Sequence, residues 1–87
     1  MNPRHALMES VRQHLMANAV SRAIPLLEQV LEHAPEDAQA WGLLGRCLRL
    51  SGEPERAESA LRRSLELMPT LRASQVELAT LLRDTGH

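Results

Sequence analysis

Hydrophobic residues recur along this chain at intervals of three and four residues. In residues 38–50 these positions are Ala40, Trp41, Leu44, Cys47 and Leu48. This spacing places them on one face of an α-helix. Residues 54–68 carry a second stripe with the same spacing. Two amphipathic helices joined by so short a connection predict an antiparallel helical hairpin.

The segment between the two stripes carries residues that end one helix and begin the next. Gly52 suits the left-handed conformation that commonly follows the last turn of a helix. Pro54 suits the first turn of the following helix, where a missing N–H is tolerated. Pro69 ends the second stripe, because the residue before a proline is disfavoured in helical conformation.

The same arrangement recurs when the chain is compared with itself at an offset of 34 residues. Identical residues then align at positions with structural roles, including Arg12/Arg46, Ala23/Ala57, Leu27/Leu61, Pro35/Pro69 and Gly52/Gly86. Asn18 aligns with Gly52, and Asn is the next most tolerant residue of the left-handed conformation. A single domain over residues 1–87 is therefore expected, with units of about 1–34 and 35–68 and a partial unit 69–87.

This pattern predicts about five helices, which form two hairpins and a half. The first is expected over residues 4–17, the second ends near His33, and the last spans residues 71–84. Pro25 lies inside the second helix, where it removes one backbone hydrogen bond. We expect it to kink that helix or to delay its start.

The motif Trp41-x2-Leu44-Gly45-x2-Leu48, followed by Ala57-x3-Leu61 and Pro69, resembles the tetratricopeptide repeat signature. The resemblance implies an all-α fold, in which antiparallel helical hairpins stack into a right-handed superhelix, an α-solenoid. Small residues at Gly45 and Ala57 are then expected where the two helices of a hairpin approach closely. The first unit departs from the signature, with Leu7, Ser10, Val11 and His14 at its motif positions.

Composition narrows the function classes. The net charge of −1 argues against nucleic-acid binding, which draws on a basic excess. All ten basic residues are arginine, a bias that GC-rich bacterial codon usage produces without functional selection. No apolar run approaches the roughly 20 residues of a membrane span, and residues 1–5 lack the apolar stretch of a signal peptide. The expected compartment is the cytoplasm.

No residue pattern predicts catalysis, a metal site or a cofactor. The four histidines are scattered without metal-ligand spacing. His14 is expected at the core or its edge. Cys47 is expected to be a buried, inert thiol, because nothing is placed to activate it. We therefore predict that the protein is not an enzyme and uses no cofactor.

The resemblance implies a protein–protein interaction scaffold, in which the first helix of each hairpin lines a concave groove for a peptide or partner segment. The predicted groove residues are Met8, Arg12, Leu15, Gln39, Leu43, Arg46, Arg49, Val76, Thr80 and Arg83. Their four arginines suggest an acidic partner. A simpler interpretation is that these arginines are solvated surface charges paired with Glu9 and Glu77.

An alternative function is an oligomerisation or docking segment, such as the N-terminal part of a larger protein or enzyme would supply. The last helix carries Leu78, Leu81 and Leu82, which no later helix of the chain would cover. Exposed apolar patches of this kind mark interaction surfaces. The alternative therefore predicts a homo-oligomer or a docked partner at these leucines.

Overall fold

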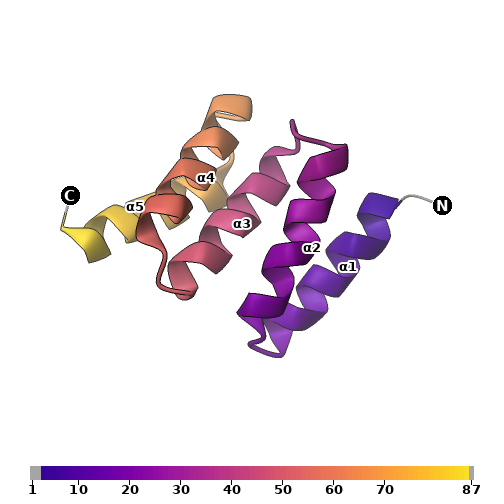
Figure 1. Ribbon diagram of the computed structural model, residues 1–87. Helices are drawn as coiled ribbons and strands as arrows, with labels where there is room; N and C mark the ends of the chain where they lie inside the picture. The colour runs from indigo at the N-terminus through magenta and orange to yellow at the C-terminus, as the bar shows by residue number, and fades with distance from the viewer. Residues whose placement is uncertain (1–2, 87) are drawn as a thin grey trace.

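The computed structural model describes residues 3–86 and contains five helices over that range (Figure 1). They are α1 (Pro3–Met16), α2 (Val20–His33), α3 (Ala38–Leu50), α4 (Pro54–Leu67) and α5 (Arg72–Thr85). None of the described residues forms a strand. The predicted all-α fold is confirmed, and each predicted helix lies within a few residues of its expected place.

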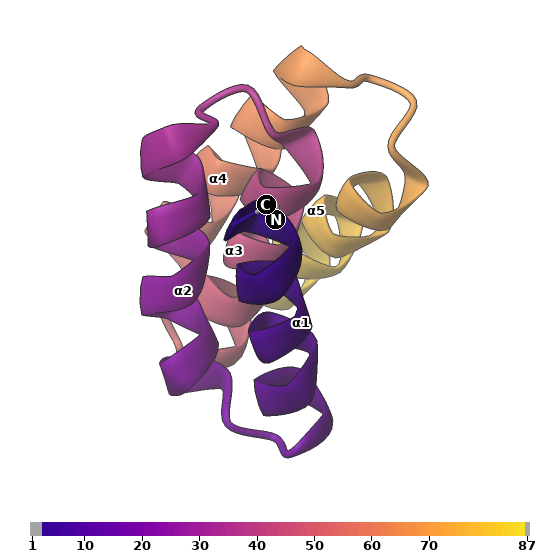
Figure 2. The ribbon, with the colours of Figure 1, turned by 90° about the vertical axis from the view of Figure 1, so that its right-hand side faces the viewer.

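The helices follow one another in chain order along a body of 42 × 27 × 18 Å. Each packs against the next, and α5 also packs against α3. The view along the stack in Figure 2 shows that α2 and α4 lie on one side of α3. Helix α5 lies on the opposite side of α3. The hairpins therefore form two layers, and α1, α3 and α5 lie in the same one.

The residues between the helices adopt the predicted conformations. Asn18, Gly52 and Gly86 all have left-handed backbones, with φ of 58°, 80° and 77°. Pro54 is the first residue of α4, as expected. The expected delay at Pro25 is wrong, because α2 begins at Val20 and continues through this proline. Pro25 is exposed to solvent, so water can reach the carbonyl that loses its helical partner.

The contact between α3 and α4 depends on a glycine. A Cβ built on Gly45 would lie 2.5 Å from Leu61 Cγ and 3.3 Å from the Ala57 carbonyl oxygen. Leu61 and Ala57 are both fully buried at this crossing. The predicted close approach is confirmed, and any side chain at Gly45 would push the helices apart.

An ion pair joins the first hairpin to the start of the second. Arg4 on α1 donates from Nε to the Asp37 carboxylate and from Nη2 to Gln39 Oε1, the latter at 3.1 Å. Asp37 also caps α3 by accepting from the Ala40 N–H at 3.1 Å. Partial burial raises the pKa of Asp37, but the bonds from Arg4 and Ala40 outweigh it and hold the pKa below its ordinary value.

Candidate partner-binding groove

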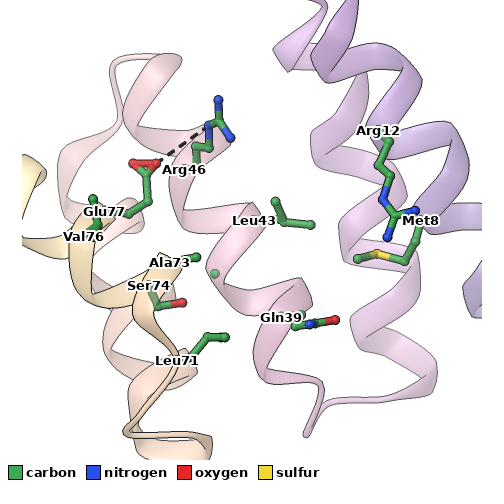
Figure 3. A pocket seen from close by; sticks show the side chains of 11 residues that line it. Met8, Arg12, Gln39, Leu43, Arg46, Leu71, Ala73, Ser74, Val76 and Glu77 are labelled. Carbon is green, nitrogen blue, oxygen red and sulfur yellow. Dashed lines mark ion pairs between the residues drawn. The ribbon is translucent and has the colours of Figure 1, made fainter.

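A pocket of about 480 Å³ opens where α1, α3 and α5 face one another (Figure 3). Met8 and Arg12 form one side, and five residues at the start of α5 form the other: Leu71, Ala73, Ser74, Val76 and Glu77. The residues between them come from α3 and include Leu43 and Arg46. Its lining is mostly apolar with a few polar groups at the edge, a composition typical of ligand pockets.

Six of the ten predicted groove residues line this pocket: Met8, Arg12, Gln39, Leu43, Arg46 and Val76. The other four, Leu15, Arg49, Thr80 and Arg83, lie outside its lining. The prediction omitted Leu71 and Ser74, which contribute to the wall beside α5. Leu71 was expected to be the first residue of the last helix, but it is the N-cap residue that precedes the helix.

Arg49 has a structural role rather than an open groove position. Its Nε and Nη2 donate to Glu77 Oε1 at 3.1 and 2.9 Å, and Nη1 lies 3.9 Å from Asp84 Oδ2. The Arg49 side chain is only 21% exposed. Two donors on one carboxylate make this a directional bond between α3 and α5.

Arg46 and Arg12 reach the pocket with weaker internal partners. Arg46 is half exposed, and its Nε lies 3.7 Å from Glu77 Oε2, the pair drawn in Figure 3. Arg12 is 66% exposed and bonds Glu9 on its own helix at 2.8 Å. The simpler interpretation, in which the arginines are surface charges paired with Glu9 and Glu77, therefore names the right partners for these two residues. Exposed pairs of this kind contribute about 0–1 kcal/mol, so either arginine can exchange its partner at little cost.

Two buried hydroxyls meet next to α4, and one of them, that of Ser74, belongs to the pocket lining. Ser64 Oγ donates to the Ala38 carbonyl oxygen at 2.7 Å and lies 2.6 Å from Ser74 Oγ. Because the Ser64 proton is used in the first bond, the Ser74 hydroxyl must donate in the second. Ser74 is only 1% exposed, so this pair fixes the packing of α5 against α4 behind the pocket.

A sequence model of the tetratricopeptide repeat family matches residues 14–85, which is most of the chain. The chain belongs to the tetratricopeptide repeat family. No curated protein matches it closely. Membership confirms the resemblance carried by the motif around Trp41, and repeats of this family generally mediate protein–protein interaction.

The leucines of the last repeat helix divide into two groups. Leu81 is 2% exposed and belongs to the core, so its predicted place on an exposed oligomer surface is wrong. It occupies the position that Cys47 holds one repeat earlier, and both side chains face inward. Leu78 and Leu82 are half-buried, while Ala79 beside them is exposed.

The chemical candidates behave as structural residues of the repeat. Cys47 is fully buried, as predicted, and burial raises the pKa of its thiol to about 11. It is therefore protonated at neutral pH and a poor nucleophile. His14 is half-buried at the edge of the first hairpin, as predicted. Residues 3–86 hold no cluster of three side chains suited to a metal, and none of their helices could cross a membrane.

Proposed function

We propose that this tetratricopeptide repeat protein is an interaction scaffold whose pocket binds a segment of a partner protein. The segment carries an apolar side chain next to a carboxylate. The observation that carries this proposal is the pairing of Glu77, whose carboxylate already accepts two hydrogen bonds from Arg49. Arg46 is consequently left with only a 3.7 Å contact beside an apolar lining.

The two parts of the pocket suit the two parts of such a segment. Leu43 and Val76 are accessible apolar side chains, and Val76 is 56% exposed. Covering them removes apolar area from water, which stabilises a complex by about 25 cal/mol per Å² before the costs of association. A partner carboxylate can then accept two parallel hydrogen bonds from the Arg46 guanidinium.

The test is selection of random displayed peptides on the immobilised 87-residue chain, followed by affinity measurements on the enriched peptides. Arg46→Glu is the variant, and Arg22→Glu on α2 is the control. Arg22 is also exposed, lies outside the pocket and carries the same charge change. Loss of a charge-assisted hydrogen bond costs about 1.5–3 kcal/mol. Arg46→Glu should therefore weaken binding about 10- to 100-fold, and Arg22→Glu should have little effect.

The proposal fails if the enriched peptides lack Asp and Glu, or if both variants weaken binding equally. Arg49→Glu is unsuitable as a probe, because it would leave Glu77 facing a like charge and loosen α5. The family is typically non-catalytic, and an absence of enzymatic activity and a cytoplasmic location stay predictions. Docking through the last helix is a second proposal, favoured by the exposure of Ala79.

A further inference from the structure

The outer face of α5 repeats a face of α3 that α4 covers. On α3, Gly45 lies directly beneath Leu61 of α4. The residue 34 positions after Gly45 is Ala79, which is exposed between the half-buried Leu78 and Leu82. We refer to these three residues as the open face of α5. Its position in the repeat shows which kind of element covers such a face.

The two helices also begin and end alike. Trp41 Nε1 donates to the Pro35 carbonyl oxygen at 2.7 Å, six residues upstream. Gln75 takes the place of the tryptophan on α5, and its Nε2 donates to the Pro69 carbonyl oxygen at 2.8 Å. The glycines that follow the two helices have φ of 80° and 77°. The start and the end of α5 therefore match those of a helix that is covered by a partner helix.

A charged residue next to the open face supports the same conclusion. Arg83 is exposed and forms no ion pair within residues 3–86. It is the repeat equivalent of Arg49, which binds Glu77 on the first helix of the following unit. A partner that continued the stack would present a carboxylate to Arg83 in the same way.

We propose that the open face of α5 docks an amphipathic helix of the α4 type, from a partner that also supplies a carboxylate to Arg83. The docking helix carries small residues where it crosses Ala79. At the equivalent crossing a Cβ on Gly45 would lie only 2.5 Å from Leu61 Cγ. Because Ala79 already has a Cβ, a leucine at that point of the partner would have to shift outward.

A second copy of the chain fits this surface less well. In head-to-tail stacking of two copies, α1 of one copy would follow α5 of the other. The α4-type helix that separates α3 from α5 along the chain would then be missing. A two-fold pairing would set α5 against another α5, whereas the equivalent face of α3 is covered by a helix of the α4 type. The occupant that the repeat favours is therefore an α4-type helix of a partner protein.

The test appends a second copy of residues 54–87 directly after His87, with Leu61 of the appended copy changed to Ala, which supplies an α4-type helix that is small at the crossing and is followed by the equivalent of Glu77. Thermal unfolding of this extended chain is compared with that of the 87-residue chain. We expect the extended chain to unfold several degrees higher. Ala79→Arg should remove this gain, while changing the 87-residue chain little because residue 79 is exposed there. Ala6→Arg, at an exposed position on α1, is the matched control and should preserve the gain.

Ala79→Gly should change the unfolding temperature of the 87-residue chain and the gain of an extended chain in opposite directions. It should lower the unfolding temperature of the 87-residue chain, because glycine weakens a helix. In a second extended chain that keeps Leu61 in the appended copy, Ala79→Gly should widen the gain, because it restores the space that Gly45 gives Leu61. A gain that survives Ala79→Arg would overturn the proposal. A concentration-dependent dimer of the 87-residue chain that Ala79→Arg abolishes would also overturn it and assign the face to a second copy.

Discussion

Gly42 tests the contact that shapes the candidate pocket. It lies on α3 where α5 passes, and a Cβ built there would meet Ser74 Oγ at 2.4 Å and Ser64 Oγ at 3.3 Å. Ser74 Cβ would remain at 3.7 Å, an ordinary contact. The obstacle to a side chain at Gly42 is thus mainly one hydroxyl oxygen, and the substitution Ser74→Ala removes it.

The expected free energies follow from this geometry. In the natural background, Gly42→Ala gains about 0.5–1 kcal/mol of helix propensity. It incurs about 1–3 kcal/mol of overpacking unless Ser74 rotates away and loses its bond to Ser64, worth about 1 kcal/mol. We expect a net loss between about 0 and 2.5 kcal/mol. With Ser74→Ala already present, the same substitution should stabilise by up to about 1 kcal/mol. The two changes therefore couple by about 2 kcal/mol.

Urea unfolding of the four chains in this cycle, followed by helix circular dichroism and by fluorescence of the single Trp41, measures the coupling. Ser74→Ala alone should cost no more than about 1.5 kcal/mol, because Ser64 keeps its bond to Ala38. Effects that add within about 0.5 kcal/mol would indicate independent sites. That result would refute the close approach of α3 and α5 at Gly42.

Two further predictions concern Asp37 and Cys47. Asp37→Asn should destabilise the chain at neutral pH, because it keeps a capping oxygen but loses the charge that binds Arg4. The pKa of Asp37 is lowered in the fold, so its stabilisation is complete above its unfolded value near 3.9 and is lost as pH falls through the folded value. Urea midpoints of the two chains should converge in acid, and a constant difference would contradict this. Cys47, with a pKa of about 11, should react with a thiol reagent only at the rate of unfolding, and rapid labelling of the native chain would show that it is accessible.

Much of the fold could be predicted because its signals are local. Asn18, Gly52 and Gly86 mark the helix ends through backbone conformations that other residues adopt less easily. Gly45 marks the crossing of α3 and α4, since only a very small residue fits there. The effect of Pro25 could not be judged from sequence, because it depends on whether the affected turn faces solvent.

The site was harder to predict, because a helical pattern gives the face of a residue but not its partner. Arg46 and Arg49 lie three residues apart and share a predicted face, yet only Arg49 forms the two-donor bond with Glu77. That bond depends on the position of α5, which the spacing along α3 does not contain. Leu81 could have been assigned correctly from the repeat, since the residue one unit earlier is the buried Cys47.

The two proposed surfaces share helix α5, with Glu77 and Ala79 on opposite sides of it. Glu77 and Ala79 are two residues apart, which corresponds to about 200° around an α-helix at 3.6 residues per turn. Val76 and Arg83 are seven residues apart, so they lie on nearly the same side of the helix, two turns from each other. A segment that covers Val76 and a partner that reaches Arg83 therefore approach α5 from the same side. The Arg49–Glu77 bond and the contact at Gly42 both oppose movement of α5. Any coupling between the two sites in the native chain should consequently come from contact between their occupants along this side, and Val76→Ala should not change binding at Ala79 when the pocket is empty.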